Sequence, residues 1–204
     1  MTVFLDYQNV YRRARATFHD HENDPHWMGQ VDPVRLAEHL AADSTYDRVL
    51  HEVRIYRGIP SQKRDPKGYA AGRRQVSGWA TDPRVKVSTR TLQYLVDPDD
   101  PDRVVSVREK GIDVALAIDF ATLALEKAYD VGILFSLDTD LNPSLEYVAA
   151  KQRAWGKPRT EVAAWTNPAL TNRRLAISGH QIYCHWVDAS AYTKVQDLRD
   201  YNAK

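Results

Sequence analysis

Residues 131–140, VGILFSLDTD, decide the fold, because they form a continuously apolar run that ends in two aspartates. A central strand of a parallel sheet is covered on both faces, so it is apolar throughout instead of alternating. A second run of this kind, TVFLD at residues 2–6, also ends in an aspartate. A helix-like segment follows each run. We therefore predict that both are central strands of one parallel sheet.

The rest of the chain alternates between strand and helix patterns. Further strands are predicted over residues 49–56, 85–96, 161–165 and 181–187, with 103–107 as a hairpin partner of 85–96. Helices are predicted over residues 7–17, 32–42, 66–81, 112–128 and 142–155, from Pro168, and at the C-terminal end. This order predicts an α/β fold, a Rossmann-like three-layer sandwich with a central, mostly parallel sheet and helices on both faces. We expect residues 1–204 to form a single domain, with 168–204 as its C-terminal extension.

The composition is that of an ordinary globular protein, with 43% apolar residues and a net charge of +1 over 204 residues. No apolar run approaches the ~20 residues that a membrane span needs. Met1 leads directly into a strand-like run, so no signal peptide is predicted. The single cysteine, Cys184, excludes an intrachain disulfide and fits a reducing compartment. We expect a cytoplasmic protein that does not bind membranes.

Four aspartates are expected at the edge of the sheet where ligands of such folds bind. Asp6 and Asp138 each follow a predicted central strand, Asp140 lies two residues further on, and Asp113 begins the helix over 112–128. Carboxylates that are brought together repel one another, and a divalent cation relieves the repulsion. Oxygen ligands without a clear cysteine or histidine partner favour Mg²⁺ or Mn²⁺, and such a site suits phosphoryl chemistry.

Each of these residues also has a structural interpretation. Asp6 is a plausible strand-end cap, Asp113 an ordinary acid in the first turn of a helix, and Asp140 a neighbour of the Asn142 cap. Asn9, three residues after Asp6, fits a helix N-cap as well as a site residue. Asp119 lies off the helix face of Asp113, which favours a structural role for it.

Three motifs occur in order over roughly residues 2–165. They are Asp6-x-x-Asn9, Lys110-Gly111-x-Asp113-Val114-x-Leu116-x-x-Asp119, and Ser136-x-Asp138-x-Asp140 followed by Pro143. Together they resemble the NYN domain family, a branch of the PIN-like nuclease superfamily, whose third motif is Ser-Gly-Asp-Ser-Asp-x-x-x-Pro. The sequence departs from that pattern at Leu137, where the family usually has glycine.

The resemblance implies a metal-dependent endoribonuclease that hydrolyses RNA phosphodiester bonds with an activated water. By this resemblance, Asp6, Asp113, Asp138 and Asp140 would bind Mg²⁺ or Mn²⁺ directly or through water, and Asn9 would support the catalytic site or the substrate phosphate. The departure at Leu137 supports an alternative, a catalytically weak or inactive module that binds RNA or protein. A phosphatase of the haloacid dehalogenase type is disfavoured, because Gln8 stands where that family needs a second aspartate.

Two basic segments are expected to contact RNA, most simply single-stranded RNA. Arg12 and Arg13 follow the first strand, and a second segment contains Lys63, Arg64, Lys67, Arg73 and Arg74. Local basic patches of this kind act even when the total charge is near zero. The alternative is that both segments are solvated faces. A homo-oligomer or a regulatory protein partner is compatible with the sequence.

Overall fold

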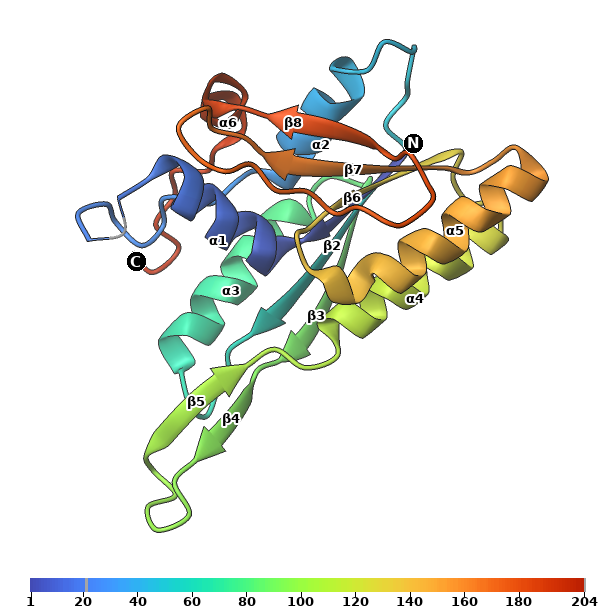
Figure 1. The fold of residues 1–204 in the computed structure, drawn as a ribbon. Helices are drawn as coiled ribbons and strands as arrows, with labels where there is room; N and C mark the ends of the chain where they lie inside the picture. Colours follow the sequence, from blue (N-terminus) through green and yellow to red (C-terminus); the bar gives the residue numbers. More distant parts are fainter. Residues whose placement is uncertain (21, 204) are drawn as a thin grey trace.

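The computed structural model describes residues 1–20 and 22–203 and confirms the predicted α/β fold (Figure 1). The strands are β1 (Thr2–Asp6), β2 (Glu52–Ile59), β3 (Val85–Thr91), β4 (Gln93–Val96), β5 (Val104–Arg108), β6 (Val131–Phe135), β7 (Arg159–Trp165) and β8 (Tyr183–Val187). The helices are α1 (Tyr7–Phe18), α2 (Pro33–Ala42), α3 (Pro66–Trp79), α4 (Ile112–Leu125), α5 (Asn142–Trp155) and α6 (Ala189–Val195), with a 3₁₀ turn, η1 (Thr139–Leu141).

Six strands form one parallel sheet in the order β3-β2-β1-β6-β7-β8. Side chains of β1 alternate between its two faces, as strand geometry requires. Val3 and Leu5 join a core with α1, α2 and α6, whereas Phe4 joins a second core with α4 and α5. The sheet is therefore covered on both faces, which explains the continuously apolar strands. Figure 1 shows α4 and α5 lying together on their side of the sheet.

Two sequence predictions need correction. The strand predicted over 85–96 divides at Leu92, whose backbone N–H donates to the Ile59 carbonyl. As a result β3 joins the main sheet, while β4 pairs with β5 in a separate antiparallel ribbon that projects from the molecule (Figure 1). The helix predicted from Pro168 does not form. Asn167 instead accepts a bond from the Ala169 N–H at 3.0 Å, an Asx turn that replaces the first helical turn.

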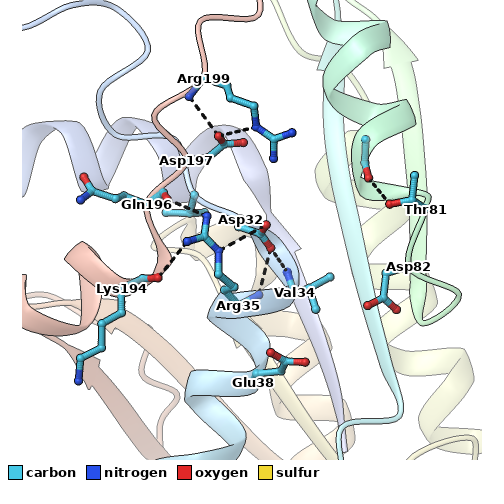
Figure 2. A network of polar contacts seen from close by, with 12 residues as sticks. Asp32, Val34, Arg35, Glu38, Thr81, Asp82, Lys194, Gln196, Asp197 and Arg199 are labelled. Atoms are coloured by element: carbon cyan, nitrogen blue, oxygen red, sulfur yellow. Dashed lines mark hydrogen bonds and ion pairs between the residues drawn. The ribbon is translucent and has the colours of Figure 1, made fainter.

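Hydrogen bonds hold the C-terminal segment against the start of α2. Asp32 caps this helix as predicted, because its carboxylate accepts from the N–H groups of Val34 and Arg35 at 3.0 and 3.1 Å. The Arg35 guanidinium donates to the carbonyls of Lys194 and Gln196 at 3.2 and 2.9 Å (Figure 2). Residues beyond β8 thus continue the same core. No helix in the two described ranges is long and apolar enough to cross a membrane.

Candidate functional site

The sheet changes winding direction between β1 and β6. These two strands are parallel neighbours, paired from Thr2 with Gly132 to Leu5 with Phe135. The helix after β1 packs on one face of the sheet and the helix after β6 packs on the other. Because the two connections diverge, a crevice opens at the carboxyl ends of both strands. Asp6 ends β1 at this crevice, and Ser136 follows β6 there.

A hollow of about 660 Å³ lies in this crevice. Three carboxylates line it together with two amides and three guanidinium groups, contributed by Asp6, Glu109, Asp138, Gln8, Asn9, Arg12, Arg13 and Arg15. We call it the acidic hollow. The three carboxylates come from three separate parts of the chain, namely the end of β1, the segment before α4 and the segment after β6. The fold therefore assembles the acid group, which no single motif contains.

Asp6 is the most buried of these acids, with 8% of its surface exposed. It caps α1 by accepting from the Asn9 N–H at 3.2 Å, and its second oxygen accepts from the Ser136 hydroxyl at 2.8 Å. Burial raises the pKa of Asp6 to about 6, and the charges of Glu109 and Asp138 act in the same direction against the two hydrogen bonds. A bound cation would offset this cost of ionising Asp6.

The segment after β6 is held against the start of α1 by hydrogen bonds on both sides of Leu137. The Asn9 side-chain oxygen accepts from the Leu137 N–H at 3.0 Å, and the Ser136 hydroxyl oxygen accepts from the Asp138 N–H at 3.0 Å. Among the described residues, Lys127 is the single non-glycine residue with positive φ. Leu137 therefore adopts an ordinary backbone conformation, and this turn does not require glycine.

The predicted acids differ in their placement. Asp138 is half-buried at the acidic hollow and caps η1 by accepting from the Asp140 N–H at 3.0 Å. Asp140 is exposed, and Asp113 is half-buried in the first turn of α4; neither lines the hollow. Asp119 accepts from the Tyr56 hydroxyl at 2.7 Å, which agrees with the structural role favoured for it.

Glu109 is the site residue that the sequence analysis missed. Its carboxylate accepts from the Gly58 N–H, which ties the segment before α4 to the end of β2. Gly111 then turns the chain into α4 with φ of 76°. The available signal was position alone, because Glu109 directly precedes the Lys110-Gly111 pair of the second motif. The sequence pattern around Glu109 does not distinguish it from the acidic residues of the neighbouring hairpin.

The predicted basic residues fall into two groups. Arg12 and Arg13 are exposed on α1 and line the acidic hollow. The second group lies before and along α3 and does not line that hollow; its members are Lys63, Arg64, Lys67, Arg73 and Arg74, all exposed. Arg15 has a structural role, because its guanidinium donates to the carbonyls of Asp24 and Met28 at 2.8 and 3.3 Å.

Comparison with known proteins identifies the family. The family model of the NYN domain matches residues 1–175. The chain belongs to the NYN domain family. The chain is also similar to a solved structure, a protein of unknown function (VPA0982) from Vibrio parahaemolyticus RIMD 2210633. The two are 20% identical with a TM-score of 0.47, over 83% of this chain and 82% of that one. No curated protein matches the chain.

The NYN domain is a PIN-like family of ribonucleases, and nucleases of this kind generally use divalent metals. The carboxylates of the acidic hollow supply oxygen ligands, which Mg²⁺ prefers. However, within residues 1–20 and 22–203 no three His, Cys, Asp or Glu side chains converge closely enough to enclose an ion. The chain thus provides carboxylates around a hollow, and it does not provide a closed cage of protein ligands.

Proposed function

We propose that this NYN domain is a metal-dependent endoribonuclease that hydrolyses RNA phosphodiester bonds with Mg²⁺ or Mn²⁺. The observation that carries the proposal is the acidic hollow itself. Three carboxylates from distant parts of the chain line one space at the switch point of the sheet, and three arginines of α1 line the same space. A cation and a phosphate are the two groups that this combination of charges accommodates.

The absence of a closed cage is compatible with magnesium. Mg²⁺ keeps several of its waters and is commonly bound by one or two carboxylates together with substrate phosphates. Asp6 and Asp138 would be the direct ligands in our proposal, with Glu109 beside them. Asp113 and Asp140, which the family resemblance implicates, would act through water. When bound, the ion polarises the phosphodiester and generates a nucleophile from water.

The protein's own residues would position the site and the substrate. Ser136 donates to Asp6 and so fixes the orientation of that carboxylate. Asn9 holds the backbone of Leu137, which places Asp138 at the start of η1. Arg12 and Arg13 would bind the RNA phosphates in register with the carboxylates, because guanidinium groups match phosphate geometry.

A cleavage assay tests the proposal. The chain is incubated with labelled single-stranded RNA and Mg²⁺, in parallel with Asp138→Asn and with Asp99→Asn as a control in the exposed β4–β5 loop. Asparagine retains an oxygen that can cap η1, so the fold should persist. We expect Asp138→Asn to lower the cleavage rate by roughly 100-fold or more and Asp99→Asn to leave it unchanged. Equal cleavage by Asp138→Asn would exclude this site.

A second function is favoured by one observation, the lack of a converging three-residue metal group in the described ranges. It is a non-catalytic module that binds RNA or protein on the same fold. Calorimetric titration with Mn²⁺ separates the two. Binding that is lost in Asp6→Asn and Asp138→Asn supports the nuclease, whereas no heat of binding in the wild-type chain supports the module.

A further inference from the structure

A second hollow of about 180 Å³ adjoins the acidic hollow along α1. Gln8 and Tyr11 line both hollows, so the two are separated by a single turn of this helix. The second hollow also contains Arg57, at the carboxyl end of β2, and Gln75 of α3. We call it the arginine hollow. None of the three carboxylates of the acidic hollow lines it.

Arg57 is a partly buried cation without an acidic partner. Its guanidinium lies over the rings of Tyr7 and Trp79, at 5.3 and 5.5 Å from their centres. One end of the guanidinium donates to the side-chain oxygen of Gln75. Its Nη2 group has no acceptor, and Arg57 forms no ion pair with a carboxylate, anywhere in the part of the chain that the structure describes.

This arrangement is costly unless an anion completes it. Removing a guanidinium from water is unfavourable without a compensating charge, and burial accordingly lowers the pKa of Arg57. Glu109, the carboxylate whose charge acts on Arg57, accepts from the Gly58 N–H instead of from the guanidinium. Nη1 and Nε donate to Gln75 and to the Gly58 carbonyl, which leaves Nη2 as a charged donor that suits an anionic oxygen.

We propose that the arginine hollow binds a phosphate group of the RNA, next to the bond that is cut in the acidic hollow. The inference rests on the proposed function only in taking RNA as the source of the phosphate. Arg57 would bind the phosphate through Nη2, and Tyr7 and Trp79 would hold the guanidinium in place. The phosphate is either an internal phosphodiester or a terminal 5′-monophosphate, and both have the same chemistry at Arg57.

Equilibrium binding of RNA tests the proposal without requiring cleavage. Every chain carries Asp138→Asn, EDTA is present, and fluorescence anisotropy follows a 3′-labelled single-stranded RNA with either a 5′-phosphate or a 5′-hydroxyl. We expect Arg57→Gln to weaken binding about tenfold. It should also make the slope of log K against log salt shallower by about 0.7, the share of one phosphate contact. Arg153→Gln on α5 is the matched control and should change neither quantity.

The two RNAs distinguish the sources of the phosphate. An effect of Arg57→Gln on both RNAs assigns an internal phosphodiester, and an effect confined to the 5′-phosphorylated RNA assigns the chain terminus. Unchanged affinity and an unchanged salt slope with both RNAs overturn the proposal. Because cleavage is not measured, an inactive protein whose RNA binding depends on Arg57 would contradict the nuclease assignment and still support this inference.

A second variant removes the risk that Arg57→Gln misfolds. Gln75→Glu keeps Arg57 and places a carboxylate at the position that now accepts from it. Gln75 also donates to the Tyr7 hydroxyl and the Gln30 side-chain oxygen at 3.1 and 2.7 Å, and glutamate loses these two bonds, so the melting temperature is measured to check that the variant folds. The variant should weaken RNA binding as much as Arg57→Gln does, because the guanidinium is then neutralised internally. If Gln75→Glu folds and binds RNA with unchanged affinity, the proposal is wrong.

Discussion

The position of Asp6 in the fold alters its acidity. Its pKa is raised from 3.8 to about 6, chiefly by burial, so the folded state binds this proton more tightly than the unfolded chain does. The metal-free protein should therefore lose stability as the pH rises from about 4 to about 6, by about 3 kcal/mol. The same proton should compete with a cation, so Mn²⁺ binding should weaken as the pH falls below about 6.

Asp6→Asn tests this directly. The substitution removes the charge and keeps groups that can bond to Ser136 and to the Asn9 N–H. In EDTA we expect it to increase the free energy of unfolding by about 1–3 kcal/mol at pH 7.5, and by roughly half as much at pH 5, where the unfolded chain has already lost this proton. Urea denaturation at the two pH values measures the difference, with Asp99→Asn as the control. A loss of stability at pH 7.5 would show that the ionised carboxylate is already compensated.

Leu137 gives a second test at this scale. Leu137 has an ordinary backbone conformation and its N–H is bonded to Asn9, so glycine at this position has no strain to relieve. Leu137→Gly should destabilise the protein by roughly 1–2 kcal/mol, through backbone entropy and the loss of a half-buried side chain. RNA cleavage should not increase. A marked gain in cleavage rate would show that leucine impairs the site.

The residues of the site were predictable to different degrees. Asp6 and Asp138 follow apolar strands, and strand ends of a parallel sheet have a known place in the fold. Glu109 has no such marker, because its position depends on the irregular segment that leads through Gly111 into α4. Arg57 belongs to a strand whose end lies beside α1 and α3 in the folded protein. Contacts between residues that are far apart in the sequence leave no pattern in the sequence around either residue.

At the scale of elements, β7 and β8 are joined to the segment before β2 by a buried ionic group. Glu161 of β7 accepts from Arg48 at 2.6 and 2.7 Å and contacts His185 of β8 at 2.8 Å. Burial alone would raise the pKa of Glu161, but the hydrogen bonds from His185 and Arg48 outweigh burial and hold it at about 2. The stabilisation is present above pH 4.5 and is lost as the pH falls toward 2.

Glu161→Gln should therefore destabilise the folded protein strongly. It leaves the charge of Arg48 buried, with 7% of its side chain exposed, and we expect a loss of about 3–5 kcal/mol at pH 7. The matched control is Asp130→Asn, which breaks the exposed pair with Lys157 and should cost less than about 1 kcal/mol. Thermal and urea denaturation compare them. Similar small losses for both variants would mean that the buried group contributes little.

Elements with strong patterns were predicted, and those set by tertiary contacts were not. The apolar runs of β1 and β6 and the Asp32-Pro33 start of α2 are local signals, and the structure confirms them. The division at Leu92 depends on its bond to Ile59 in a neighbouring strand. The segment after β7 forms an Asx turn because two asparagines, Asn167 and Asn172, bond to nearby backbone groups.

For the whole molecule, the net charge of +1 means that attraction to RNA must come from local groups. Arg12 and Arg13 at the acidic hollow are the first such groups. Replacing both with glutamine should make the slope of log K against log salt shallower by about 1.4 for single-stranded RNA. Anisotropy titrations over a range of salt concentrations measure it. An unchanged slope would place the RNA on another surface.

The central claim is that the carboxylates of the acidic hollow hold the cation with which RNA is cut. A metal-rescue assay with Asp138→Cys tests it most directly, because a thiolate binds Mg²⁺ poorly and Cd²⁺ well. Cleavage of single-stranded RNA by this variant should fall roughly 100-fold or more with Mg²⁺ and recover with Cd²⁺, relative to the wild-type chain with each ion. Cleavage by Asp138→Cys at the wild-type rate with Mg²⁺ would contradict the assignment.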